Sequence, residues 1–156
     1  MVFPRAFQSY VPRTHCVDSL VYGIVLLNTF NEVAVVRGRK SMKWSFPKGH
    51  GSTRETPLEA SIRELKEETG VDMKGVTPDD EIRFNSGTYF VYIISERIPL
   101  IPEDTNEIID SMWVSLSRIR HLTTNKDLTS FYRTINLDNL SRKIDLKKES
   151  LTLQSI

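Results

Sequence analysis

Residues 49–71, GHGSTRETPLEASIRELKEETGV, carry the strongest structural signal in this chain. Thr56 is placed as a helix N-cap, Pro57 suits the first helical position, and Glu59 completes a capping box. Gly70 is placed to end the helix. The segment between these two ends is therefore predicted to be helical.

Three glutamates of this helix, Glu64, Glu67 and Glu68, are spaced by three and four residues. At about 100° per residue they cover an arc of about 100°. An apolar stripe is expected on a different side of the helix, formed by Leu58, Ile62, Leu65 and Thr69. Carboxylates this close repel one another, whereas Mg²⁺ and Mn²⁺ prefer carboxylate oxygens as ligands. The spacing therefore predicts a divalent-metal site on the helix.

The complete spacing resembles the Nudix signature: Gly, five residues, Glu, seven residues, Arg-Glu, an aliphatic residue, any residue, Glu-Glu, any residue, Gly, aliphatic. Every specified position is matched between Gly49 and Val71. The resemblance implies an α/β (α+β) fold, an α/β/α sandwich with a mixed sheet that carries the acidic helix. It also implies a hydrolase that uses one to three Mg²⁺ or Mn²⁺ ions to cleave a phosphoanhydride bond in a nucleotide-like substrate.

The same resemblance implies roles for individual residues. The metal ligands would be three carboxylates and one backbone carbonyl, from Glu64, Glu67, Glu68 and Gly49. The base for the attacking water would be Glu64, Glu68 or the downstream Glu107, and the sequence leaves that choice open. Glu55 and Arg63 would form a supporting pair that orients the acidic helix, as groups behind metal ligands commonly do.

Candidates for substrate contact lie outside the glutamate cluster: Lys48, His50, Arg39 and Tyr89. Lys48 and His50 flank Gly49 at the mouth of the predicted metal site, with a solvent-exposed loop as the alternative. Arg39 belongs to a basic cluster with Arg37, Lys40 and Lys43, which is either a substrate-entry patch or a solvated hairpin end. Tyr89 is a stacking or phosphate-binding candidate or an ordinary strand residue, whereas Trp44 and Phe46 are predicted core residues.

Residues 44–50, WSFPKGH, resemble two groups of Nudix enzymes, which hydrolyse diadenosine polyphosphates or remove the 5′ cap of messenger RNA. The Pro-Lys-Gly-His run with Tyr89 favours dinucleoside polyphosphates as the lead substrate. Glu107-Ile108 followed by Trp113, together with a basic C-terminal segment, favours capped mRNA as the alternative. Diphosphoinositol polyphosphates and a catalytically inactive nucleotide-binding module rank lower, the latter because every acidic ligand is present.

The remaining pattern predicts one Nudix domain over residues 18–136. Strands are expected at 19–27, 33–36, 44–46, 81–85, 89–95 and 111–114, and further helices at 116–122 and 126–135. Residues 1–17 are expected to be a lead-in. Residues 137–156 are expected to be a basic extension, either an amphipathic end or a partly ordered tail.

Composition limits the other possibilities. The chain has 156 residues, 21 basic and 20 acidic, with a net charge of +1. This balance predicts no stable DNA partner and no binding to anionic membranes, so the expected partner is a nucleotide or capped-RNA substrate. A single cysteine, Cys16, and an N-terminus without signal-peptide character indicate the cytoplasm, with the nucleus as the alternative. The oligomeric state is left open.

Overall fold

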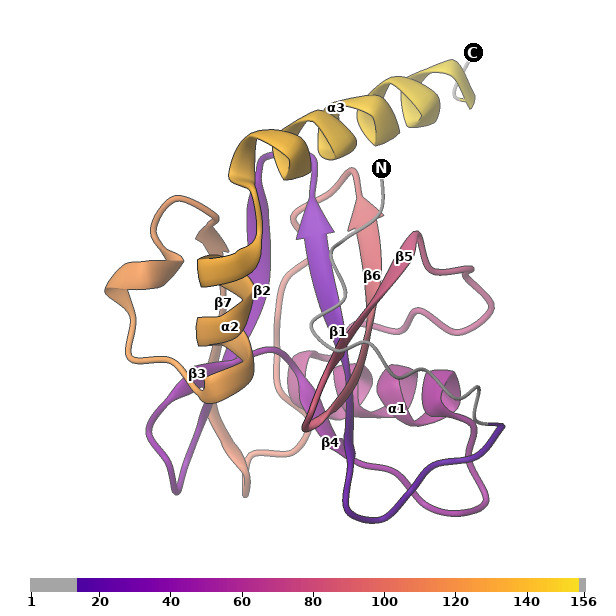
Figure 1. Cartoon of the computed structure of the whole chain (residues 1–156), viewed down its shortest axis with the longest axis vertical. Coiled ribbons are helices and arrows are strands. Elements are labelled where there is room, and N and C mark those ends of the chain that lie inside the picture. The colour runs from indigo at the N-terminus through magenta and orange to yellow at the C-terminus, as the bar shows by residue number, and fades with distance from the viewer. Residues whose placement is uncertain (1–13, 155–156) are drawn as a thin grey trace.

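The computed structural model describes residues 14–154, which form a mixed seven-stranded sheet with helices on both faces (Figure 1). In chain order the elements are β1 (Val21–Asn28), β2 (Glu32–Gly38), β3 (Trp44–Ser45), β4 (Lys48–His50), α1 (Pro57–Thr69), β5 (Asp80–Phe84), β6 (Gly87–Ile94), β7 (Ile108–Ser115), the 3₁₀ turn η1 (Ile119–His121), α2 (Lys126–Thr134) and α3 (Leu137–Gln154). The predicted fold class is confirmed.

Strand β1 forms the centre of the sheet, whose main path runs β3-β2-β1-β6-β5. It pairs in parallel with β6 along its whole length, and antiparallel with β2 and β4. Val25 and Leu27 face one apolar cluster and Ile24 and Leu26 face the other, and all four are fully buried. An unbroken apolar run is the expected sequence of a strand covered on both faces.

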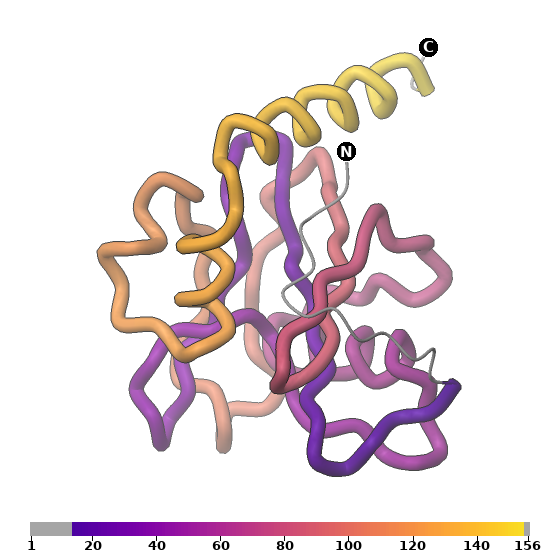
Figure 2. Tube along the Cα trace, viewed as in Figure 1, coloured from indigo at the N-terminus to yellow at the C-terminus, as the bar shows by residue number. Residues whose placement is uncertain are grey.

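The two faces are covered by different helices (Figure 2). Leu65 of α1 packs with Val71 and Met73 against one face. Phe131 of α2 and Leu140 of α3 pack against the other face. This arrangement places the acidic helix alone on its side, next to β1 and β4.

Strands β1 and β2 pair at a single register position, Leu27 with Val33, and then diverge. Beyond that point β4 pairs with the first residues of β1, while β3 pairs with the last residues of β2. The sheet is therefore split at one end, between β1–β4 on one side and β2–β3 on the other. The candidate site lies at this split.

The prediction of a helix over residues 116–122 is wrong, because only the 3₁₀ turn η1 forms there. The Trp44 amide donates to the Thr123 carbonyl at 2.8 Å, and the Asn125 amide donates to the Trp44 carbonyl at 3.0 Å. These bonds hold residues 123–125 against β3 and end the turn. The second predicted helix is confirmed as α2, with Asn125 as its N-cap.

The predicted basic extension is helical from its start, as α3. Leu140 and Ile144 are buried in the core, and Lys143 and Lys147 form ion pairs of 2.7 and 2.8 Å with Asp80 and Asp79. Residues 137–144 thus share a core with the predicted domain, while the far end of α3 projects away from the sheet (Figure 1). The predicted lead-in falls mostly outside the described residues.

No helix within residues 14–154 has the length and apolar character needed to cross a membrane.

Candidate active site

A cavity of about 470 Å³ opens where the sheet splits. Its lining comes from β1, the β2–β3 hairpin, β4, α1, the start of β7 and the residue that caps α2. This volume lies within the range of ordinary small-ligand sites. The cavity therefore joins segments from most of the chain length around the acidic helix.

Helix α1 forms as the sequence predicts. The Thr56 hydroxyl accepts from the Glu59 amide, and the Glu59 carboxylate accepts from the Thr56 amide. Gly70 ends the helix with φ of 77°, and its amide donates to the Lys66 carbonyl. Both ends are therefore fixed by local hydrogen bonds, which define where the helix begins and ends.

The acidic arc is not separate from the buried face of α1, which corrects the sequence-based expectation. Glu64 and Glu68 are only 7% and 4% exposed and lie beside Leu65 on the face that contacts β1 and β4. Glu67 is different, because 41% of its side chain is exposed. Two of the three carboxylates are thus held in a partly desolvated place.

Burial raises the pKa of both of these groups. Desolvation is the largest cause that raises the pKa of Glu68, to about 8, and the nearby charges of Glu64 and Glu107 act in the same direction. The Lys48 amide opposes this by donating to the Glu68 carboxylate at 3.1 Å. Desolvation also raises the pKa of Glu64, against the effect of Arg63.

Arg63 and Glu55 form the supporting pair that the sequence suggests. Arg63 donates to both carboxylate oxygens of Glu55, at 2.8 and 3.1 Å, and this contact lowers the pKa of Glu55. Arg63 also donates to Glu64 at 2.9 Å and to the His50 carbonyl at 3.1 Å. One guanidinium therefore connects the loop before α1, strand β4 and the acidic helix.

Gly49 lies on β4 directly against α1. A β-carbon at this position would lie 2.3 Å from the carboxyl group of Glu64, so a larger residue would force the Glu64 side chain to move. Close approach of a backbone is a common reason for glycine. The contact supports the expectation that the Gly49 backbone and the Glu64 side chain belong to one site.

The donor chemistry suits a hard divalent cation, since several carboxylates and a backbone carbonyl meet here. Within residues 14–154, however, no three acidic, histidine or cysteine side chains converge in a metal-binding arrangement. Two of the candidate ligands accept hydrogen bonds from the protein itself: Glu67 accepts from Arg63 at 3.2 and 3.3 Å, and Glu68 accepts from the Lys48 amide at 3.1 Å. The residues fit the metal in kind, and Arg63 donates hydrogen bonds to two of them, Glu64 and Glu67.

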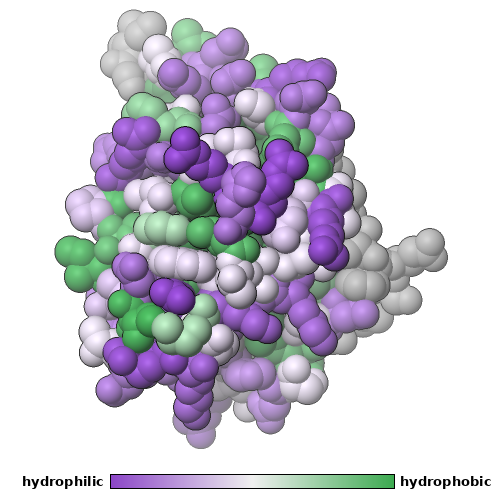
Figure 3. Space-filling view, turned by 90° about the vertical axis from the view of Figure 1, so that its left-hand side faces the viewer, coloured by the Kyte–Doolittle hydropathy of each residue, from purple (hydrophilic) through white to green (hydrophobic). Residues whose placement is uncertain are grey.

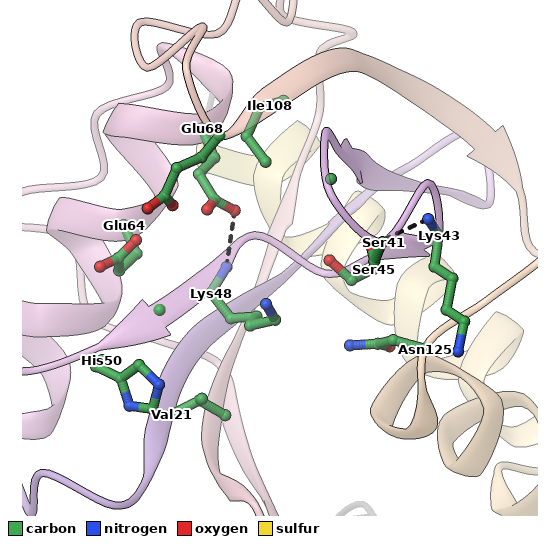
Figure 4. Close-up of a pocket in the computed structure, with 13 residues that line it drawn as sticks. Val21, Ser41, Lys43, Ser45, Lys48, His50, Glu64, Glu68, Ile108 and Asn125 are labelled. Carbon is green, nitrogen blue, oxygen red and sulfur yellow. Dashed lines mark hydrogen bonds between the residues drawn. The ribbon is translucent and has the colours of Figure 1, made fainter.

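The fold places some of the other predicted site residues at the cavity and others away from it. Lys48 and His50 line the cavity with Glu64 and Glu68 (Figure 4). Glu107 is also part of the lining. In the same view the carboxylates of Glu64 and Glu68 point from α1 toward the strand that carries Lys48.

Arg39 is not part of the cavity lining. Its guanidinium donates to the Thr105 carbonyl at 2.8 Å, and its amide donates to the Glu107 carbonyl at 2.8 Å. These contacts tie the loop that carries Glu107 to the β2–β3 hairpin. Its position indicates support of that loop in place of the expected substrate contact.

Tyr89 is fully buried, so its position does not support the expected stacking or phosphate contact. Its hydroxyl donates to the buried carboxylate of Asp127, and its ring packs against Phe46 and Phe84. Trp44 and Phe46 are core residues, as predicted. We therefore leave Tyr89 out of the candidate site.

The lining residues that were missed as individual site candidates from the sequence include Lys43 and Asn125. Lys43 was noted only as part of a basic cluster, and Asn125 only as a helix cap. They are 82 positions apart in the chain (125 − 43), and the pairing of Trp44 with residues 123–125 brings them to one wall. No local pattern carries that information.

A mixed sheet sandwiched by helices, with a capped acidic helix beside a split in the sheet, defines a Nudix-type hydrolase site. The family model described as NUDIX domain matches residues 19–135, and the chain belongs to this family. It is thus a Nudix hydrolase family member, a family that acts on pyrophosphate bonds and generally uses divalent metal ions.

Curated relatives share sequence with part of the chain. The m7GpppN-mRNA hydrolase of Saccharomyces cerevisiae is 30% identical over 106 residues, covering 64% of this chain and 11% of that protein. An RNA pyrophosphohydrolase of Xanthomonas campestris is 44% identical over 61 residues, covering 36% of this chain and 30% of that protein. The match thus spans about a tenth and under a third of these two relatives.

Solved structures share the fold. An Ap4A hydrolase from C. elegans, in a binary complex, has a TM-score of 0.60 at 18% identity and covers 74% of this chain and 93% of its own. The NUDIX domain of Shewanella oneidensis NrtR, complexed with ADP ribose, has a TM-score of 0.60 at 16% identity and covers 80% and 90%. At these identities the likeness shows the architecture alone.

Proposed function

We propose that this protein is a Mg²⁺- or Mn²⁺-dependent pyrophosphohydrolase that cleaves a phosphoanhydride bond at the 5′ end of RNA, either a cap or a 5′-polyphosphate. The observation that carries the reaction type is the placement of two buried carboxylates, Glu64 and Glu68, on a cavity wall beside the Gly49 backbone. A divalent cation favours the ionised form of buried carboxyl groups, and a pyrophosphate needs a cation to be cleaved.

In this reaction a water oxygen attacks one phosphorus atom, the bridging P–O bond breaks, and the departing phosphate keeps the bridging oxygen. Glu64, Glu67, Glu68 and the Gly49 carbonyl would hold one to three ions, which neutralise phosphate charge and activate water. Glu64, Glu68 and Glu107 line the cavity, and one of them takes the proton of the attacking water. Arg63 orients the acidic helix, and Lys48 and His50 contact substrate phosphates from β4.

The RNA end ranks first because of the sequence relatives. Two of them, at 30% and 44% identity, are named for hydrolysis of the mRNA cap and of RNA pyrophosphate. The Ap4A hydrolase resemblance, at 18% identity, shows the fold only. Because the matches cover small parts of the relatives, the substrate is a proposal for this chain and not a property carried over from them.

Dinucleoside polyphosphates are the second candidate, favoured by the run Pro47-Lys48-Gly49-His50. Two of these residues, Lys48 and His50, line the cavity beside the carboxylates. A messenger RNA cap contains the same chemical unit, two nucleosides joined through a phosphate chain. The two candidates therefore share the reacting part of the substrate and differ in what lies beyond it.

A hydrolysis panel tests the proposal with Mg²⁺ and Mn²⁺. The substrates are capped RNA, 5′-triphosphorylated RNA, diadenosine tetraphosphate, ADP-ribose and a diphosphoinositol phosphate. We expect the highest kcat/KM for one of the two RNAs. Faster turnover of diadenosine tetraphosphate would establish the second candidate instead, and turnover of no substrate, with nucleotide binding retained, would identify an inactive binding module.

A further inference from the structure

The wall of the cavity that lies opposite α1 has no role in the proposed reaction so far. It is formed by the β2–β3 hairpin and by Asn125, and it carries Ser41, Lys43 and Asn125 (Figure 4). No acidic residue occurs between Glu32 and Glu55, a stretch that contains the whole hairpin. An anionic substrate would thus meet donors and positive charge on this side.

The side-chain oxygen of Asn125 is used by a hydrogen bond within the protein, so only its side-chain N–H groups are available to a ligand. Its side-chain oxygen accepts from the Leu128 amide at 3.0 Å and caps α2. The side-chain nitrogen has no hydrogen bond within the described residues, and in Figure 4 it points to the side on which Lys48 lies. Capping therefore fixes this amide in the orientation that presents its N–H groups to a ligand.

Lys43 stands on the same wall, on a hairpin whose backbone is well fixed. The Lys43 amide donates to the Ser41 hydroxyl at 3.1 Å, and the Lys43 carbonyl accepts from the Gly38 amide at 3.1 Å. Met42 has a φ of 59°, and the Arg37 guanidinium donates to its carbonyl at 3.1 Å. The Lys43 ammonium itself makes no ion pair within residues 14–154.

The surface around the hairpin is polar. Figure 3 views the molecule from the side on which Figure 1 places β3 and η1. Hydrophilic side chains gather at its upper and lower ends, with paler and apolar residues across the middle. The lower end, where Figure 1 places the β2–β3 hairpin, is thus hydrophilic.

We propose that Lys43 and Asn125 form a second phosphate-binding point, which holds the part of a polyphosphate chain that lies beyond the carboxylates. This inference rests on the proposed function and adds a specificity to it: the enzyme favours substrates with three or more phosphates over those with two. A phosphate oxygen accepts well from a charged ammonium and from an amide N–H. We expect a diphosphate held at α1 to leave this second point empty, because it has no further phosphate group to place there.

The test compares diadenosine tetraphosphate with ADP-ribose, which has two phosphates. Lys43→Ala and Asn125→Asp should each lower kcat/KM for the tetraphosphate by about tenfold or more, mainly through KM, because a charge-assisted contact to substrate is lost. The same variants should change kcat/KM for ADP-ribose less than about twofold. Asp is as good an N-cap as Asn, so Asn125→Asp keeps α2 while it replaces the donor by a negative charge.

The chain offers matched controls. Asn136 caps α3 in the same way, accepting from the Asn139 amide at 3.1 Å, and it does not line the cavity. Asn136→Asp should therefore leave both substrates unaffected, as should Lys40→Ala on the same hairpin. Equal losses for both substrates, or losses in the control variants as large as those at Lys43 and Asn125, would overturn the inference.

A binding measurement separates this inference from the proposed function. Calorimetry with inorganic tripolyphosphate, without metal, needs no turnover. Weaker binding by Lys43→Ala and Asn125→Asp than by the controls supports the second phosphate point even if no substrate of the panel is hydrolysed. Unchanged tripolyphosphate affinity in both variants would overturn it even if the protein proves to be an active hydrolase.

Discussion

The two walls of the cavity are built on opposite principles. The α1 wall carries Glu64 and Glu68, which are buried and close to each other, and Arg63 links one of them to Glu55. The opposite wall carries Lys43, which is exposed and has no ion pair within the described part of the chain. On the first wall, burial and neighbouring carboxylates raise the pKa of Glu64 and Glu68, whereas Lys43 on the second wall is exposed to solvent. A polyphosphate can contact both walls because it is negative along its whole length. One part of it would bind the cations held by the α1 wall, and the other part would contact Lys43.

The largest effect should come from the acidic wall. We expect Glu68→Gln to lower kcat by about 10²–10⁴-fold while the protein stays folded, because a neutral amide cannot replace a carboxylate as ligand or base. Steady-state kinetics with Mg²⁺ or Mn²⁺ and a thermal melt of the same sample give the answer. Near-normal turnover by this variant would remove the acidic wall from the mechanism.

A second change breaks the support behind that wall. Arg63→Ala leaves the carboxylates of Glu55 and Glu64 without their main partner, so unfolding free energy should fall by about 1–2 kcal/mol. The expected loss of unfolding free energy is small because Arg63 is 38% exposed and solvent screens the ion pair. Arg63→Lys should recover only part of the loss, since an ammonium cannot reproduce the two-pronged contact. Urea denaturation measures both, and full recovery by lysine would contradict the geometry.

The pH dependence of the metal-free protein tests the burial of the first wall. Burial raises the pKa of Glu68 to about 8 from an ordinary 4.5. Between these values the folded protein keeps a proton that the unfolded chain has released, so stability falls as pH rises through this window. Melting temperatures of the protein in chelator should therefore decrease from about pH 5 to pH 8 by at least a few degrees. Glu68→Gln should flatten the dependence of melting temperature on pH. An unchanged slope in this variant would show that another titratable group causes this dependence.

The smallest effect should come from Arg39, which anchors the loop that carries Glu107. Arg39→Ala removes one hydrogen bond to the Thr105 carbonyl but keeps the backbone bond to Glu107. We expect kcat to fall by up to about tenfold, because the Glu107 loop loses one anchor, with stability changed by less than about 1 kcal/mol. The exposed pair Lys66–Glu103 holds the same loop from α1, so Lys66→Ala is a fitting comparison. A rise in KM alone would instead favour direct substrate contact by Arg39.

The acidic wall could be predicted because everything that specifies it is local. A capping box, helical periodicity and the Arg63–Glu55 spacing lie within residues 49–71, and a helix places its side chains by angle alone. The central strands were predictable for a related reason, since a strand covered on both faces is apolar throughout. The sequence could not show that Glu64 and Glu68 turn toward β4, because apolar spacing suggested a different buried face.

Only the tertiary structure decided the opposite wall. Lys43 and Asn125 meet because the backbone of Trp44 pairs with residues 123–125, and Tyr89 is withdrawn because Asp127 accepts its hydroxyl in the core. Arg39 supports the Glu107 loop for the same kind of reason, since its partners lie more than 60 positions away. By itself the sequence determined which residues can hold cations, because helix geometry is set by neighbours along the chain. Which residues face those cations across the cavity depends on contacts between distant strands and loops, and these exist only after the sheet has formed.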